Sequence, residues 1–238
     1  MTDDSVILKK AGVFVMTAGA VLLLSALLLL CHNRSESVRA GQQAERLLEG
    51  IEAYLADAPA AQTVSAPADD PSDENASKEG GDTGPFASAS SDRPQPYDPE
   101  MPTVILDGYG FVGHLEIPAL ALELPILSEW SYDRLKIAPC RQFGSSRTDD
   151  LVIAAHNYRS HFGRLRELAA GDAVFFTDMD GLSSAYSVED IRVVQPTEIA
   201  CVRDSGFALV LYTCTYGGES RVAVFCSRAG AESGSPCL

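Results

Sequence analysis

The sequence predicts an all-β domain, a barrel or a sandwich, carried behind an N-terminal membrane helix. Short runs of alternating or β-branched apolar residues recur from residue 110 onward. Turn-forming residues separate these runs roughly every ten positions, which is typical of all-β folds. The helix is indicated by residues 11–31, which carry no charge and are dominated by Leu, Val and Ala. Those twenty-one residues are long enough to cross the hydrocarbon core of a bilayer.

We interpret residues 11–31 as an uncleaved signal-anchor. Two lysines precede the segment and Arg34 follows it, which modestly favours a cytoplasmic N-terminus at residues 1–10. A cleaved signal peptide is the alternative, but its apolar region would be shorter and no small-x-small cleavage site follows. The leucines before Cys31 disfavour a lipoprotein cysteine. The sequence therefore predicts a single-pass cell-membrane protein with most of its chain on the extracellular side.

Two segments connect the membrane helix to the folded domain, which is predicted at residues 101–238. Residues 32–56 have apolar residues at helical spacing, namely 44, 47, 48, 51, 54 and 55. They predict a helical stalk, with a coiled-coil contact as the alternative. Residues 57–100 are rich in Ala, Ser, Asp, Pro and Gly, with ten acidic residues against Lys78 and Arg93. Such a segment buries too little apolar surface to offset its ordering entropy. We expect a disordered acidic spacer that holds the domain away from the bilayer.

Charge and cysteine content exclude some classes of function. The formal net charge is −15, whereas a nucleic-acid-binding protein would present a basic face. The six cysteines form no CxxC pair and no Cys/His spacing typical of zinc, so we expect no metal and no other cofactor. A disulfide between two of the cysteines Cys140, Cys201, Cys226 and Cys237 remains an alternative, because this part of the chain is expected outside the membrane. Unpaired buried thiols are favoured for Cys201 and Cys226.

The elements of the folded domain follow in order. We expect strands at 110–118, 119–127, 150–156, 173–177, 184–194, 208–213 and 222–226, with a helical turn at 132–137 and a short helix at 162–169. Pro125 indicates an edge or a break in the second strand. Asp178 and Asp180 lie in a turn, and turn formation is favoured over metal binding for both.

The last two strands bring a candidate nucleophile to one edge of the sheet. Cys214 ends the first strand, and Arg221 begins the second after a connection that contains two glycines. Paired antiparallel, the strands would place the thiol and the guanidinium side by side. A permanent cation near a thiol lowers its pKa, and the thiolate is the reactive species. A lone cysteine in a strand is more often an inert buried side chain, so this interpretation depends on its neighbours.

A candidate base ends an earlier strand. The apolar run DLVIAAH finishes on His156, and a strand-end His with a distant strand-end Cys is the arrangement expected of a catalytic pair. His161, five residues on, is the rival and is otherwise a substrate-pocket or surface residue. His114 lies within a strand and is interpreted as structural, and His32 adjoins the membrane segment.

Three motifs in this order resemble the sortase family of cysteine transpeptidases. The Leu-Tyr-Thr-Cys that ends at Cys214, the following Arg221 and the earlier strand ending at His156 carry the resemblance. The usual family pattern is Thr-Leu-x-Thr-Cys, then an Arg at the start of the next strand. Here Val210 replaces the first Thr, and the seven-residue spacing from Cys to Arg is short for the family. The opening GHLEIP is also similar, so the resemblance covers about residues 110–228.

This resemblance implies an eight-stranded β-barrel with short helices. It implies Cys214 as the nucleophile, His156 as the acid and base, and Arg221 as the residue that stabilises the oxyanion. The family motif places the catalytic His at the strand end, which selects His156 over His161. We predict that Thr213 and His161 contact the substrate. Some sortases bind calcium, but no carboxylate cluster here demands it.

The resemblance also implies the partners. The expected substrate is a secreted protein with an LPxTG-like sorting signal near its C-terminus, cleaved through a thioester on Cys214. The expected acceptor is an amine of a cell-wall precursor or of a pilin, so surface-protein anchoring and pilus assembly both stay open. Anchorage through residues 11–31 fits, because such substrates emerge at the membrane surface. Residues 97–99 only weakly resemble the lid of pilin-polymerising sortases, and an ordinary turn is favoured.

Two other functions compete with this one. A non-catalytic, membrane-tethered β-domain that binds wall or partner proteins would be expected to lack at least one of Cys214, His156 and Arg221. A hydrolytic cysteine peptidase of papain type places its Cys before its His, which is the reverse of the order here.

Overall fold

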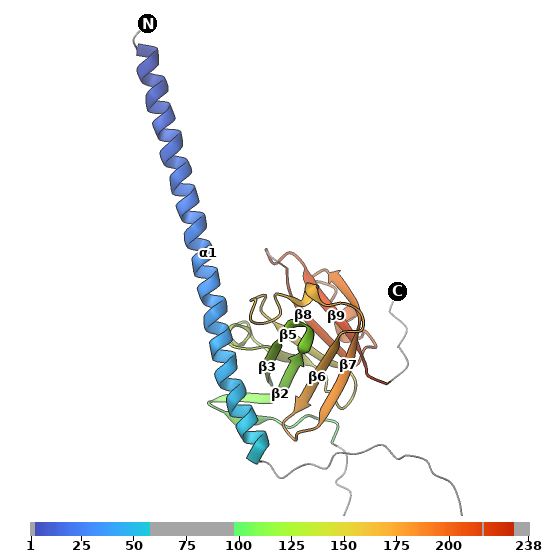
Figure 1. The fold of residues 1–238 in the computed structure, drawn as a ribbon. Helices are drawn as coiled ribbons and strands as arrows, with labels where there is room; N and C mark the ends of the chain where they lie inside the picture. Colours follow the sequence, from blue (N-terminus) through green and yellow to red (C-terminus); the bar gives the residue numbers. More distant parts are fainter. Residues whose placement is uncertain (1–2, 58–97, 216, 231–238) are drawn as a thin grey trace, which may run out of the picture.

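A computed structural model describes residues 3–57, 98–215 and 217–230, which form a long helix and a β-barrel (Figure 1). The helices are α1 (Asp3–Asp57) and α2 (Ile199–Arg203), with short 3-10 helices η1 (Pro118–Leu120), η2 (Arg134–Lys136) and η3 (Leu165–Glu167). The strands are β1 (Val104–Leu106), β2 (Tyr109–Ile117), β3 (Leu122–Leu127), β4 (Cys140–Phe143), β5 (Leu151–Ala155), β6 (Ala173–Asp178), β7 (Ser183–Val194), β8 (Leu209–Cys214) and β9 (Arg221–Arg228).

Eight of these strands close into a barrel. The sheet has the order β1-β2-β3-β4-β5-β8-β9-β7-β6, and β6 pairs back onto β2. The short β1 pairs with the start of β2 and lies outside the closed ring. The predicted eight-stranded barrel with short helices is therefore confirmed. Pairing around the ring leaves no free edge among these eight strands, which is how a barrel protects its backbone from edge-to-edge association.

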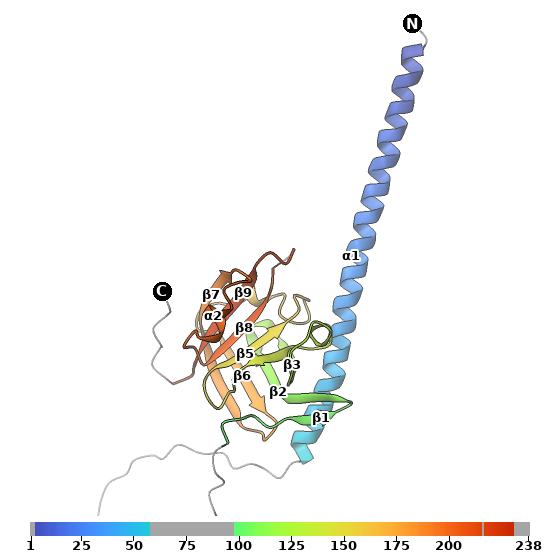
Figure 2. The ribbon, with the colours of Figure 1, turned by 180° about the vertical axis from the view of Figure 1, so that it is seen from behind.

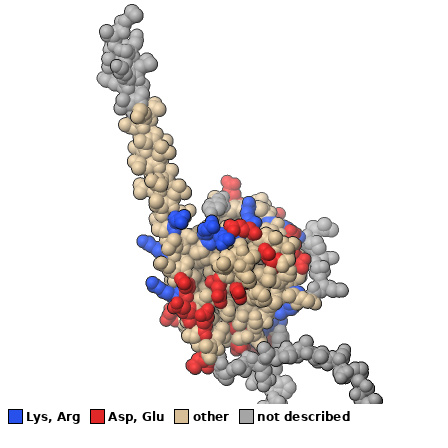
Figure 3. Space-filling model, in the orientation of Figure 1, with Lys and Arg blue, Asp and Glu red and all other residues tan. Residues whose placement is uncertain are grey.

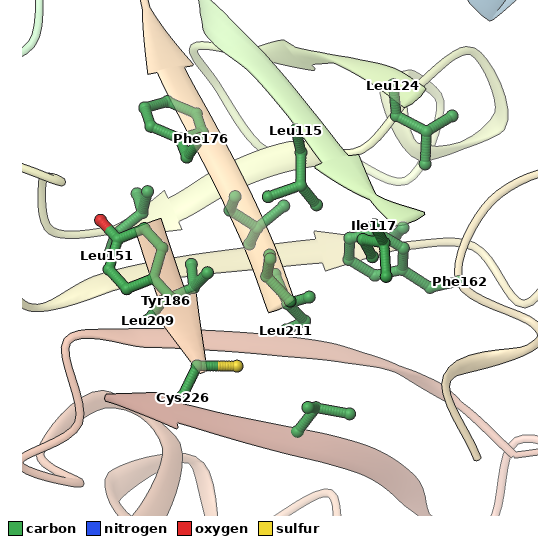
Figure 4. Close-up of a cluster of buried hydrophobic side chains, with 14 of the residues drawn as sticks. Leu115, Ile117, Leu124, Leu151, Phe162, Phe176, Tyr186, Leu209, Leu211 and Cys226 are labelled. Atoms are coloured by element: carbon green, nitrogen blue, oxygen red, sulfur yellow. The ribbon is translucent and has the colours of Figure 1, made fainter. Parts of the chain in front are cut away.

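Alternating side chains fill the inside of the barrel (Figure 4). Several are at most 1% exposed: Leu115, Ile117, Leu151, Phe162, Phe176, Tyr186, Leu209, Leu211 and Cys226. A second cluster, with Val152, Val202, Val210 and Phe225, lies where α2 covers the outside of the barrel (Figure 2). The middle strands β5, β8 and β9 are thus buried on both faces. Strands covered on both faces read as near-continuous apolar runs, which explains DLVIAAH and ALVLYTC.

The elements that the sequence missed are short or depend on tertiary contacts. β1 has three residues and β4 has four, which is too little for a period-2 pattern to be recognised. The five-residue α2 is set by packing of Val202 on the barrel. The predicted helix at 162–169 forms only the single turn η3.

The helix α1 has two different surfaces along its length. Between Phe14 and Leu30 its apolar side chains are exposed, as with Leu24 at 60% and Leu30 at 69%. This part gives a candidate membrane span, with a mean hydropathy of 2.5. Further along, a stripe at helical spacing is buried: Ala40, Ala44, Leu47, Leu48 and Ile51. The stripe packs chiefly on β3 and also contacts β1 and β2 (Figures 1 and 2).

This docking bears on the expected geometry of the connecting segments. The predicted stalk at 32–56 continues the membrane helix without a break and packs on the barrel of its own chain. The helix therefore carries the barrel directly, and the role of residues 57–100 as a spacer stays a prediction. Whether that segment is disordered stays a prediction, because residues 58–97 lie outside the described part of the chain.

Figure 3 shows a group of acidic side chains low on the barrel beside α1 and several basic side chains higher along the helix, while side chains of both signs also occur elsewhere on this face.

Docking of α1 should contribute measurably to stability. Ile51 is fully buried between the helix and the barrel, whereas Tyr54 on the same helix is 38% exposed. Ile51→Ala should lower the free energy of unfolding by about 2–5 kcal/mol, and Tyr54→Ala should have a much smaller effect. Denaturant unfolding of the full chain in detergent micelles tests this. Equal effects of the two substitutions would show that the stripe is not docked in solution.

Candidate active site

The two strands that carry Cys214 and Arg221 pair as the sequence predicts. β8 and β9 are antiparallel, and the last residue of β8, Cys214, lies directly opposite the first residue of β9, Arg221. Directly opposed residues of an antiparallel pair point to the same face of the sheet. The connection turns through Gly217 and Gly218, whose φ angles of 91° and 76° favour glycine.

His156 reaches the same edge from the neighbouring strand. β5 and β8 are parallel, and their last pair in register is Ala155 with Thr213. His156 and Cys214 each come one residue later, so they leave the sheet at adjacent positions on strands about 4.8 Å apart. The Thr213 hydroxyl donates to the Ala155 carbonyl at 2.9 Å and ties the two strand ends together. The structure thus brings together the three residues that were predicted to be catalytic.

Cys214 lies between two hollows in the barrel surface. One, of about 190 Å³, is largely apolar and is lined by Trp130, Tyr212 and Arg221 among others. The other, of about 460 Å³, is bordered by Asn157 and the β8–β9 connection. Cys214 is itself half-buried. An extended ligand laid across both hollows would place one of its bonds at the thiol.

His156 is held in a partly buried aromatic environment. Its ring stacks on Tyr158, with centroids 3.9 Å apart and planes 19° apart. Burial lowers the pKa of His156 below its usual value, and hydrogen bonding to Asn157 partly opposes that shift. Nδ1 is buried without a hydrogen-bond partner in the described part of the chain. A ring with a lowered pKa is mostly neutral near pH 7 and is able to accept or relay a proton.

Arg221 is fixed by the loop that it follows. Its Nη1 donates to the Gly218 carbonyl at 2.9 Å and to the Ser220 carbonyl at 3.0 Å. The guanidinium has five N–H donors in a planar fork. Donors therefore remain for a ligand in the hollow that Arg221 lines.

The two residues predicted to contact substrate are both buried. Thr213 is 3% exposed, and its hydroxyl is bonded to the Ala155 carbonyl. His161 is fully buried beside Tyr158, with ring centroids 5.5 Å apart. The structure therefore gives both residues a place behind the site, and contact with substrate stays a prediction for each.

Burial of His161 should make the fold sensitive to acid. Desolvation is the main cause that lowers its pKa to about 4, from a usual value of 6.5. Between these values the unfolded chain binds a proton that the folded chain does not, so stability falls as the pH falls. The loss attributable to His161 should reach about 2 kcal/mol by pH 5. Unfolding measured at pH 7, 6 and 5 should show a steeper loss for wild type than for His161→Gln. Parallel curves would contradict the assignment.

The remaining cysteines divide into inert and accessible thiols. Cys140 and Cys226 are unpaired and buried, and burial raises the pKa of each to about 12. Cys201 is also unpaired but is exposed on α2, which corrects the expectation that it is buried. Cys237 lies outside the described residues.

The acidic turn near β6 has a structural role. Asp178 is fully buried, and its carboxylate accepts two hydrogen bonds from Arg147 and two from backbone amides of the turn. Asp180 also pairs with Arg147. Within the described part of the chain, no three His, Cys, Asp or Glu side chains are grouped so as to hold a metal ion.

Tyr158 and Tyr212 are site residues that sequence reasoning did not single out. Tyr158 stacks on His156, and Tyr212 lines the apolar hollow with its hydroxyl donating to Gln142. The signal for Tyr158 was its place two residues after the strand-end His. Tyr212 is adjacent to the Thr-Cys pair, but only the barrel shows which face it occupies.

Comparison with known proteins finds similarity over the barrel. A family model described as Sortase domain matches residues 115–229. None of the curated proteins matches the chain. Similar solved structures include sortase C1 of GBS Pilus Island 1, with 21% identity and a TM-score of 0.44 over 52% of this chain and 67% of that one. Sortase C from Clostridium perfringens SM101 has 29% identity and a TM-score of 0.44, covering 51% and 71%. Sortase A from Corynebacterium diphtheriae has 19% identity and a TM-score of 0.47, covering 53% and 64%.

Proposed function

The chain carries a sortase domain, which residues 115–229 match, and on that premise we propose that it is a membrane-anchored cysteine transpeptidase. The observation that carries the proposal is the register at one sheet edge. Cys214 opposes Arg221 on β9, and His156 follows the residue that pairs with Thr213 on β5. A nucleophile, a base and a fixed donor of hydrogen bonds at one edge are the groups that acyl transfer needs.

Each residue has a role in the first half-reaction. His156 takes the proton of the Cys214 thiol, and the resulting thiolate attacks the carbonyl carbon of the Thr in an LPxTG-like sorting signal and forms a tetrahedral intermediate. Arg221 and nearby backbone amides stabilise the negative oxygen of that intermediate. The C–N bond then breaks, and His156 gives a proton to the departing amine. The product of this step is a thioester between Cys214 and the substrate.

The second half-reaction regenerates the enzyme. His156 takes a proton from the incoming amine, whose nitrogen attacks the thioester carbonyl. The new C–N bond forms as the C–S bond breaks, and Cys214 leaves as a thiolate. We infer that the amine belongs to a cell-wall precursor or to a pilin, so that the reaction anchors surface proteins or assembles pili.

The position of the site supports substrates delivered at the membrane. A third hollow, of about 680 Å³, lies between α1 and the site loops and is lined by Leu30, Arg34, Asn157 and Gly217 among others. Asn157 also borders the hollow that contains Cys214. The end of the candidate span and the nucleophile are therefore connected along one face, on the side that we place outside the cell.

A peptide assay tests the proposed function. The full chain in detergent micelles is incubated with a panel of sorting-signal peptides, with and without amines such as hydroxylamine or oligoglycine. We expect cleavage between Thr and the following residue, with transfer to the amine and a trapped acyl-enzyme at Cys214. Peptide binding without any cleavage across the panel would instead favour a non-catalytic binding domain.

A further inference from the structure

The helix α1 contacts the loop that carries His156, just after the candidate membrane span. Ser160 donates a hydrogen bond from its hydroxyl to the Ser37 carbonyl at 2.7 Å. The Tyr158 hydroxyl donates to Glu36 at 3.4 Å. Gly41 lies so close to the loop that a Cβ at this position would be 2.9 Å from the Ser160 Cβ. Successive turns of α1 therefore touch one short loop.

The same loop sets the plane of the His156 ring. Tyr158 is 8% exposed and has the His156 ring stacked against it at 3.9 Å. On its other side lies the buried His161, with ring centroids 5.5 Å apart. His156 Nδ1 has no hydrogen-bond partner among the described residues, so the imidazole is oriented by the stack on Tyr158 together with the hydrogen bond to Asn157 of the same loop.

We propose that α1 is a positioning element of the active site: it clamps the loop at residues 157–161 and, through Tyr158, fixes the orientation of the His156 ring. The proposal rests on the proposed function in taking His156 as the catalytic acid and base. Tyr158, Ser160, Glu36 and Gly41 are positioning residues, because they act through His156.

The physical reason is the cost of a misplaced proton donor. Misplacement by about 1 Å costs up to roughly 100-fold in rate, and without the helix the loop would lose its contacts with Glu36, Ser37 and Gly41. Glu36 lies five residues beyond Cys31, which is about 7.5 Å along a helix axis. The clamp therefore begins within two turns of the candidate span, and membrane anchorage and ring orientation depend on one rigid element.

A glycine pair on α1 provides a matched test. A Cβ added at Gly41 meets Ser160, whereas a Cβ added at Gly50 on the same helix meets nothing within 4 Å. Both substitutions to Ala raise helix propensity by a similar amount. In the full chain in micelles, Gly41→Ala should lower kcat for peptide transfer roughly 10- to 100-fold with KM changed less than about twofold. Gly50→Ala should leave both unchanged.

Removing the obstacle should remove the effect. Ser160→Gly deletes both loop atoms that the new methyl group meets. Relative to Ser160→Gly alone, adding Gly41→Ala should then cost less than about twofold, a coupling that a double-mutant cycle measures. Equal losses from Gly41→Ala with and without Ser160, or equal losses from Gly41→Ala and Gly50→Ala, would overturn the proposal.

An NMR measurement, which does not require enzyme activity, tests this proposal independently of the proposed function. The Hε1 proton of His156 is observed by NMR in a histidine-labelled chain and assigned by its loss in His156→Gln, and it belongs to the ring that stacks on Tyr158. Gly41→Ala should move its chemical shift toward that of Tyr158→Leu, whereas Gly50→Ala should retain the wild-type shift. If no peptide is cleaved, the proposed function fails, but the chemical shift still shows whether α1 fixes the orientation of the His156 ring. A resonance that Gly41→Ala leaves unmoved overturns the clamp whatever the activity.

Discussion

Replacing Cys214 with Ala should abolish peptide cleavage and the covalent acyl-enzyme, a loss on the order of 10⁴-fold or more for removal of a nucleophile. The reason is that no other described thiol shares its place: Cys140 and Cys226 are buried with raised pKa values, and Cys201 lies on α2. Because Cys214 is half-buried at a strand end, the melting temperature should change little. Turnover and mass spectrometry of trapped enzyme measure the loss of activity and of the acyl-enzyme.

The matched controls use the other candidates. Cys201→Ala should retain full activity. His156→Ala should be nearly as damaging as Cys214→Ala, while His161→Ala should lose less turnover and more stability because that ring is fully buried. An active Cys214→Ala, or an essential His161 beside a dispensable His156, would show that the catalytic residues are wrongly assigned.

Arg221→Lys should lose most of the activity although the charge is kept. The guanidinium is a planar fork of donors, whereas a lysine ammonium is a point charge on a flexible stem. Arg221 uses Nη1 to hold the Gly218 and Ser220 carbonyls, so its other nitrogens can face a ligand, and a single ammonium nitrogen does not reproduce this separate placement of donors. Loss of one well-placed oxyanion donor costs roughly 100- to 1000-fold in turnover. We expect turnover of Arg221→Lys to fall by about that factor.

The alternative role of Arg221 predicts a different pattern. If its charge mainly lowered the Cys214 pKa, Lys would rescue much of the activity that Ala loses, and the pH dependence of Cys214 alkylation would shift only in Arg221→Ala. Alkylation rates are best measured in a Cys201→Ser background, because Cys201 is exposed. Turnover of Arg221→Lys close to wild type would leave the residue as an electrostatic neighbour only.

The relation between α1 and the barrel changes how the anchor is understood. A spacer between anchor and domain would let the site move freely, but the buried stripe from Ala40 to Ile51 fixes the barrel on the helix. The acidic segment then joins the far end of α1 to Met101, which is buried in the core. On the proposed function, substrate would have to come to a site held at a fixed distance from the candidate membrane span.

The sequence alone determined the fold class and the three residues that meet at the sheet edge. Period-2 apolar runs separated by turns predicted the β domain, and strand-end positions predicted that His156, Cys214 and Arg221 would lie together. These inferences succeed because side-chain alternation and strand ends are visible in the chain itself, and because the order of the three motifs resembled that of a known family; the pairing of β5 with β8 joins residues 58 apart in sequence.

The tertiary structure alone decided what the apolar stripe of the stalk packs against and how the His156 ring is held. An apolar stripe at helical spacing indicates that one face of the helix is buried, but it does not identify what covers that face. The positions of Leu47 and Ile51 were therefore equally consistent with a stalk, with a coiled coil and with packing on the barrel of the same chain. Likewise, Tyr158 and Glu36 are 122 residues apart in sequence. Contacts at that separation depend on how the helix docks, which no local pattern encodes.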